Sequence, residues 1–241
     1  MGDRTTPSEG VDVYLTASPE PQAARLLAAA IAAADARHGA ARLAVAGGSA
    51  LRALRAAREA LPPAVWARVR LTWVDERCVP FASPDSNRGE AHRSGALDAA
   101  CPPALELAIV EDGEAFDAAV ARVEAGLRAS FADGGSVGLD VTLLGMGPDG
   151  HIASLFPGDA PFEEPAGALA RHVPDSPKPP ASRITLSRAL LATARVHVLL
   201  AAGEGKREAL ERLILEDPRL PAVGLDGLAI VTDVDLSDGT V

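Results

Sequence analysis

A glycine-rich segment, residues 138–158, constrains the fold of this chain more than any other stretch. It begins with a short, mostly apolar run, residues 141–144, which predicts a buried strand. Residues 145–150 follow with three glycines and a proline, which allow neither a regular strand nor a full helix. The loop ends on His151. In open α/β sheets, ligands are handled by loops of this kind at the carboxyl ends of strands.

His151 itself has two interpretations. A lone histidine is often structural, but an imidazole at such a loop can exchange a proton near neutral pH. The glycines of the loop also match the dinucleotide fingerprint G-x-G-x-x-G, which requires a long helix after the loop. Pro157-Gly158 stops any such helix, and Asp149 would place a negative charge beside the pyrophosphate. The dinucleotide interpretation is therefore rejected.

The bulk composition favours one globular domain. A chain of 241 residues with 48% hydrophobic content can bury a single large core, so we predict one domain over residues 1–241, with flexible ends at 1–9 and 234–241. The net charge of −10 argues against nucleic acid as a partner. No apolar run reaches the length of a membrane span, and the N-terminus lacks a signal-peptide core. Cys78 and Cys101 have no CxxC spacing, so neither a disulfide framework nor a zinc site is indicated. A cytoplasmic location is expected.

Strand-like and helix-like patterns alternate along the chain, which predicts an α/β domain with a mainly parallel sheet. The expected strands are 11–15, 43–46, 69–74, 105–110, 141–144, 195–201 and 228–231, and the expected helices are 18–37, 50–60, 86–97, 114–131 and 206–215. The helix at 114–131 is expected to bury an apolar stripe of Phe116, Val120, Val123 and Leu127.

Four polar or glycine-rich loops each follow a predicted strand. They are Gly47-Gly48-Ser49, Asp75-Glu76-Arg77, residues 145–151 and Gly203–Lys206. Because the carboxyl ends of parallel strands meet at one edge of a sheet, we expect all four loops to line one crevice. Helix-start amides, a few cations, two carboxylates and one imidazole would meet there. That combination suits a small phosphorylated, polyhydroxylated molecule.

The anion-binding part of this crevice rests on separate signals. A predicted strand leads into the turn Gly47-Gly48-Ser49, and a predicted helix follows it. This arrangement can bind an anion through the free amides of the helix start and the helix dipole. Ser49 could also be a simple N-cap. The chain has only two lysines, Lys178 and Lys206. Lys178 lies in the stiff segment Pro177–Pro180, which leads to Arg183. For the charged residues 75–77, a site and a rim salt bridge remain equally open.

Five motifs together resemble the 6-phosphogluconolactonase family: Ala46–Ser49, Trp73–Arg77, Ser86-Asn87, Leu144–Pro157 and Pro177–Thr185. The match covers nearly the whole chain and keeps order and spacing. The resemblance implies a three-layer, Rossmann-like α/β fold with a mainly parallel sheet, similar to glucosamine-6-phosphate deaminase. It also implies hydrolysis of 6-phospho-D-glucono-1,5-lactone to 6-phosphogluconate, the second step of the oxidative pentose phosphate pathway, without a cofactor.

In this interpretation His151 takes a proton from the water that attacks C1 and returns it to the ring oxygen. Arg77 faces the developing oxyanion. Asp149 orients His151 or its loop, and Asp75 and Glu76 position Arg77 or bind sugar hydroxyls. The candidates for the phosphate are Gly47, Gly48, Ser49, Arg183 and Lys206, with Lys178 assisting. Related enzymes often carry a hydroxyl and a proline where this chain has Ala50-Leu51, which puts one phosphate contact in doubt.

Three alternatives are weighed. An amino-sugar-phosphate deaminase or isomerase would carry a glutamate five residues after the histidine, where this chain has Phe156. A sugar-phosphate sensor domain would carry an added DNA-binding segment. Cys78 beside Arg77 has no adjacent histidine to make it a nucleophile. No metal is predicted, because the five histidines show no ligand spacing. A monomer and a small homo-oligomer both remain open.

Overall fold

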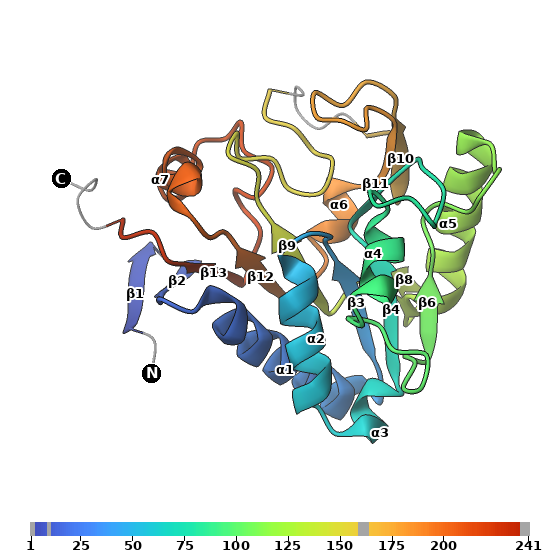
Figure 1. The fold of residues 1–241 in the computed structure, drawn as a ribbon, viewed down its shortest axis with the longest axis horizontal. Helices are drawn as coiled ribbons and strands as arrows, with labels where there is room; N and C mark the ends of the chain where they lie inside the picture. Colours follow the sequence, from blue (N-terminus) through green and yellow to red (C-terminus); the bar gives the residue numbers. More distant parts are fainter. Residues whose placement is uncertain (1–2, 9–10, 159–163, 237–241) are drawn as a thin grey trace.

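The structure is a computed structural model that describes residues 3–8, 11–158 and 164–236. Its main sheet has eight strands (Figure 1). In sheet order these are β1 (Asp3–Ser8), β2 (Val11–Leu15), β13 (Leu228–Thr232), β12 (Val196–Leu200), β9 (Val141–Gly145), β3 (Ala41–Val45), β4 (Val69–Trp73) and β6 (Leu105–Leu107). Every neighbouring pair is parallel except β1 with β2. The predicted α/β fold with a mainly parallel sheet is confirmed.

Two long helices pack on the central strands. Helix α1 (Pro19–His38) starts with proline at its first position, where no amide is needed, and ends at Gly39 in the left-handed conformation, φ 70°. It packs against α2 (Ala50–Ala60) and against β3, β9 and β12. The remaining helices are α3 (Pro63–Trp66), α4 (Asn87–Arg93), α5 (Phe116–Ser130), α6 (Arg188–Leu191), η2 (Glu204–Lys206) and α7 (Arg207–Ile214).

Helix α5 only partly follows its predicted apolar stripe. Val123 and Leu127 are buried, whereas Phe116 is 42% exposed. Phe116 is the first residue of the helix, and its ring lies against that of His172 with 4.4 Å between the centroids. The expectation of a buried Phe116 is therefore wrong, because the stripe turns towards the core only after the first turn.

A second, antiparallel sheet was not predicted. It consists of β10 (Ala170–Val173), β11 (Arg183–Leu186) and β5 (Asp75–Arg77), in that order. Residues 75–77 were expected as a loop because three consecutive charged residues do not look like a strand. They form a strand because β11, more than 100 positions later in the chain, pairs with them in an antiparallel ladder of backbone hydrogen bonds. A short hairpin of β7 (Ala132–Asp133) and β8 (Ser136–Val137) completes the strands.

The expected flexible ends also differ from the structure. Asp3–Ser8, placed in the flexible segment 1–9, forms β1 and pairs with β2. At the other end Val234 is buried, and residues 237–241 of the predicted tail lie outside the described residues. In the described part of the chain, none of the helices has the length and apolar character that crossing a membrane requires.

The strand order reverses between β3 and β9. The chain proceeds outward from β3 through β4 to β6, then returns to place β9 on the other side of β3 and continues outward to β12 and β13. A crevice forms at such a switch point, outside the carboxyl ends of the two central strands. The loops after β3 and β9 are the glycine turn at 47–49 and the loop that ends on His151.

The buried core contains one titratable group that should make stability depend on pH. His197 on β12 is fully buried, and its Nδ1 lies 2.7 Å from the Thr142 hydroxyl. Burial lowers the pKa of His197 from 6.5 to about 4. The contribution of neutral His197 to the free energy of unfolding is therefore complete above its unfolded pKa of 6.5. It is lost as the pH falls from 6.5 through 4, because the unfolded chain takes up a proton that the folded chain excludes.

The difference between the unfolded and the folded pKa of His197 corresponds to about 3 kcal/mol in the free energy of unfolding. Urea unfolding measured from pH 7 to pH 4 should therefore show a smaller loss of stability in a His197→Asn variant than in the parent chain. Equal acid sensitivity of the two proteins would contradict this assignment.

Candidate active site

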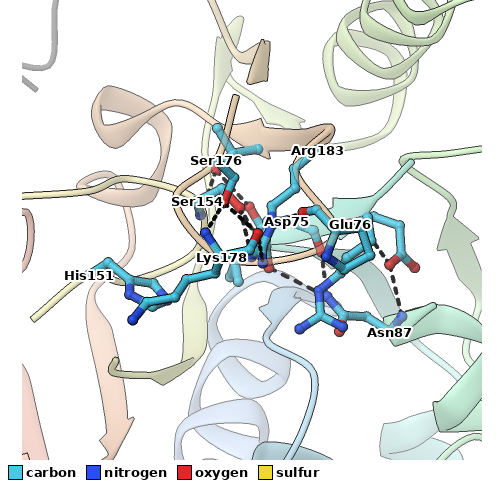
Figure 2. Close-up of polar contacts among 12 residues, drawn as sticks. Asp75, Glu76, Asn87, His151, Ser154, Ser176, Lys178 and Arg183 are labelled. Carbon is cyan, nitrogen blue, oxygen red and sulfur yellow. Dashed lines mark hydrogen bonds and ion pairs between the residues drawn. The ribbon is translucent and has the colours of Figure 1, made fainter. Parts of the chain in front are cut away.

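One cavity of about 400 Å³ opens at the carboxyl ends of β3, β4, β9 and β12. The predicted residues that line it are Gly47, Gly48, Ser49, Asp75, Arg77, His151, Lys178, Arg183 and Lys206. The expected convergence of the four loops is confirmed. Two predicted site residues, Asp149 and Glu76, lie outside this lining. Figure 2 shows Asp75, Ser154 and Arg183 gathered between His151 on one side and Glu76 and Asn87 on the other.

His151 and Asp149 form a close pair. The Nδ1 of His151 lies 2.6 Å from Oδ1 of Asp149. Because a carboxylate only accepts, Nδ1 carries the proton, and the neutral imidazole therefore has its lone pair on Nε2. Burial acts to raise the pKa of Asp149, but the hydrogen bond and charge of His151, a backbone hydrogen bond and the charge of Lys178 together outweigh it, so the pKa lies below its usual value. Asp149 is therefore an ionised group that fixes the ring and tautomer of His151, with the Phe156 ring at 4.8 Å on another side.

The loop that carries this pair depends on Gly147. The Gly147 amide donates to the His151 carbonyl at 2.8 Å, which closes the loop on itself. A Cβ on Gly147 would lie 2.1 Å from Nδ1 of His151 and 2.4 Å from Oδ1 of Asp149. The imidazole–carboxylate pair therefore occupies the space that any side chain at this position would need.

Both lysines line the cavity, and the charges of Asp149 and Lys178 act on Lys206. Lys178 Nζ lies 3.7 Å from Oδ2 of Asp149, the oxygen that His151 does not use. Burial lowers the pKa of Lys206, and the charge of Lys178 acts in the same direction, while Asp149 opposes it. Two neighbouring cations of this kind provide a local positive region in a chain with a net charge of −10.

The start of α2 faces the cavity through Gly47, Gly48 and Ser49. Gly48 adopts φ 65°, which an L side chain rarely adopts. The Ser49 side chain makes no capping hydrogen bond to the helix within the described chain. Ser49 is therefore not a simple N-cap. It is exposed at the start of α2, where the amides of Leu51 and Arg52 bond to the carbonyls of Gly48 and Ser49 and the helix dipole favours an anion.

Arg77 reaches the cavity from β5. One of its terminal nitrogens donates to the Asp85 carbonyl at 2.7 Å, which fixes the guanidinium plane. Its Nε is buried and has no hydrogen-bond partner among the described residues. A fixed cation at the cavity wall is suited to stabilise a carbonyl or an oxyanion by its charge.

Most donors of Arg183, which was predicted to contact the phosphate, are directed to groups of the protein itself. Its Nε donates to the Pro180 carbonyl at 3.0 Å and one Nη to the Lys178 carbonyl at 3.1 Å. The other Nη lies 3.7 Å from Asp75 Oδ2. These bonds hold the proline segment against the second sheet and supply a counter-charge to buried Asp75. Few of its donors remain for a phosphate, so we assign Arg183 to positioning.

Glu76 is turned away from the cavity. Its carboxylate accepts the backbone amides of Arg77, Asn87 and Arg88, each at 2.8 Å. This places a negative charge at the start of α4, where the helix dipole favours it. The prediction that Glu76 binds sugar hydroxyls is not supported by this placement, because alternation along β5 puts Asp75 and Glu76 on opposite faces.

Two residues of the site were missed by the sequence-based candidates. Ser154 donates its hydroxyl to Asp75 Oδ2 at 2.6 Å, and Asn87 lines the cavity beside Gly47. Asn87 is the only asparagine in the chain, which is a signal that could have found it. Cys78, in contrast, lines a separate smaller hollow with Val110 and Phe116, and burial raises the pKa of its thiol.

The fold and this cavity define a class of α/β protein in which an imidazole–carboxylate pair and an anion site share one switch-point crevice. A profile of the family described as glucosamine-6-phosphate isomerases/6-phosphogluconolactonase matches residues 17–231. The chain belongs to this family.

Individual relatives agree with this assignment. The chain is 37% identical to human 6-phosphogluconolactonase over 166 residues, which cover 69% of this chain and 63% of the human protein. It is 34% identical to the 6-phosphogluconolactonase of Caulobacter vibrioides over 208 residues, 84% of this chain and 85% of that protein. The chain thus spans about six-tenths of the length of several curated relatives that it matches. A solved 6-phosphogluconolactonase from Trypanosoma brucei superposes with a TM-score of 0.71 at 25% identity, covering 95% of this chain and 98% of that one.

Proposed function

We propose that this chain hydrolyses 6-phospho-D-glucono-1,5-lactone to 6-phosphogluconate. The observation that carries the proposal is the His151–Asp149 pair in one cavity with the exposed start of α2 and Lys206. The names of its relatives support the same reaction. A phosphorylated lactone has the two features that this cavity is built to meet, an anion at one end and an activated ester at the other.

The reaction divides into two proton transfers. Nε2 of His151 accepts a proton from water as the water oxygen bonds to C1, and Arg77 stabilises the negative charge that develops on the carbonyl oxygen. The tetrahedral intermediate then collapses, the bond from C1 to the ring oxygen breaks, and protonated His151 donates its proton to that oxygen. Asp149 remains ionised throughout and stabilises the transient imidazolium. No covalent nucleophile is required.

The phosphate end of the substrate is assigned to the start of α2 and to Lys206, with Lys178 assisting. Helix-start amides, a serine hydroxyl and an ammonium group together bind a dianion well. Asp75, held by Ser154 and Arg183, remains to accept hydrogen bonds from sugar hydroxyls.

The alternative, an amino-sugar-phosphate deaminase, is less favoured by the residue at position 156. A monomeric glucosamine-6-phosphate deaminase shares the fold, with a TM-score of 0.73 at 20% identity. Phe156 is 6% exposed, and its ring packs on His151. An apolar ring there provides no carboxylate to assist ring opening.

The decisive experiment generates the lactone from glucose 6-phosphate and follows acid release against spontaneous hydrolysis. Acceleration by the purified chain supports the proposal. Turnover of glucosamine 6-phosphate with none of the lactone would replace it by the deaminase function.

Replacing Lys206 by alanine should raise KM for the phosphorylated lactone by about one to two powers of ten, because a charge-assisted hydrogen bond contributes about 1.5–3 kcal/mol. Unphosphorylated gluconolactone should be a poor substrate and lose little further. Arg207→Ala is the matched control, since Arg207 is the adjacent cation but pairs with Glu204. Steady-state kinetics on both lactones measure the effect. An equal increase of KM for the two lactones would show that Lys206 does not bind the phosphate.

Catalysis should need no metal ion and no cofactor. A lactone is already an activated ester, so the positive charge of Arg77 at the carbonyl is sufficient. Activity is therefore expected to survive prolonged chelation and dialysis, with the lactone detected directly. Recovery of a lost activity by zinc or magnesium would overturn both this expectation and the role of Arg77.

We further propose that the chain works as one domain, in the cytoplasm, without nucleic acid or membrane as partners. A monomer and a small homo-oligomer both fit the proposed chemistry, since every assigned group comes from one chain.

A further inference from the structure

Asn87 lies at the cavity wall between the Gly47 turn and Asp75. It is the first residue of α4 and is 3% exposed. Its backbone amide donates to Glu76 Oε1 at 2.8 Å, so α4 is tied to β5 at this point. Its side chain contributes to the cavity wall.

The carboxamide of Asn87 is fixed on both sides. Nδ2 donates to the Asp75 carbonyl at 3.0 Å and lies 3.5 Å from Asp75 Oδ1. Oδ1 then faces Gly47, where an added Cβ would lie only 1.9 Å from Oδ1 and 2.4 Å from Cγ of Asn87. The side chain of Asn87 thus fills the place that a side chain at Gly47 would take, and it separates the glycine turn from Asp75.

We propose that Asn87 is a positioning residue that sets the distance between the phosphate-binding turn at 47–49 and Asp75, and so selects lactones that carry the distal phosphate. The inference rests on the proposed function. In a phosphorylated lactone the ring and the short exocyclic arm limit the separation between the phosphate and C1. Its C1 reaches His151 with the phosphate bound only if the turn stays where Asn87 holds it, and a misplacement of about 1 Å can cost up to about a hundredfold in rate.

The test begins with Asn87→Ala. Its kcat/KM for the phosphorylated lactone should fall about tenfold, while that for unphosphorylated gluconolactone stays within about twofold of the parent. Ser86→Ala is the matched control. Ser86 caps the same helix by accepting the Gly89 amide at 2.9 Å, but it lies outside the cavity lining. The Ser86→Ala variant should have a lower melting temperature, and the ratio of its kcat/KM values for the two lactones should be unchanged. An unchanged ratio in Asn87→Ala, or an equal shift in Ser86→Ala, would overturn the proposal.

A double-mutant comparison adds a readout that a merely structural role would not move. Gly47→Ala in the parent chain should lower kcat/KM for the phosphorylated lactone by roughly a hundredfold, because its methyl group displaces the carboxamide. In the Asn87→Ala background only the Cβ of residue 87 remains, at 3.1 Å, so the same change should cost at most about threefold. Equal losses in both backgrounds would contradict the coupling.

Calorimetric binding of 6-phosphogluconate separates this inference from the proposed function. If the parent chain binds the product but does not hydrolyse the lactone, the proposed function fails, and weaker product binding by Asn87→Ala still supports the role of Asn87. Equal binding by the two proteins would reject that role. Absence of binding by the parent chain would overturn both.

Discussion

His151→Ala is expected to fold normally and to lose about two to four powers of ten in kcat, the usual contribution of a positioned acid–base group. The imidazole performs both proton transfers, and among the described residues that line the cavity His151 is the only histidine. Single-turnover and steady-state kinetics on freshly generated lactone measure the loss.

His92→Ala is the matched control for this experiment. His92 also pairs with a carboxylate, at 3.0 Å from Glu106, but on α4 and away from the cavity lining. It should retain near-parental turnover. Comparable turnover in His151→Ala and the parent chain would remove His151 from the mechanism.

Gly147→Ala should abolish activity to nearly the same extent while leaving the fold intact. A methyl group there would meet the ring of His151 at 2.1 Å, and atoms do not approach so closely, so the imidazole–carboxylate pair must separate. The φ of Gly147 is not left-handed, so the backbone itself tolerates alanine. We expect a loss in kcat of at least about a hundredfold, since Asp149 would no longer orient the base.

Gly138→Ala provides the comparison at the other end of the same segment. A Cβ at Gly138 would make ordinary contact with Thr193, at 3.4 Å, so activity and melting temperature should change little. Loss of unfolding cooperativity in Gly147→Ala, or kinetics close to the parent, would contradict the steric argument. The position of the His151 resonances in NMR spectra would show the displacement directly.

The sequence predicted the sheet well because its strands are local patterns. Each central strand is a short apolar run followed by a glycine or charged loop, and parallel topology brings the loops together. The loops that carry His151 and Lys206 were placed at one cavity for this reason. The second sheet was missed because β5 is three charged residues whose partner β11 is remote in sequence.

The direction in which each polar side chain points was the second property that the sequence did not reveal. Asp75 and Glu76 are equivalent in sequence terms, yet one lines the cavity and the other caps α4. Arg183 looked like a phosphate ligand, but the carbonyls of the proline segment take up its donors. Such choices depend on long-range contacts that composition and spacing do not encode.

The position of the last strand has a consequence for how the protein is made. β13 lies between β2 and β12, and Leu228 pairs with Val11 on one side and His197 on the other. While the chain emerges from the ribosome, β2 therefore has no parallel neighbour until residue 232 is available. The sheet can close only after residues 228–232 have emerged, although His151 and Lys206 are synthesised earlier. The proposed activity should then appear in one step, once this strand is available, rather than grow with chain length.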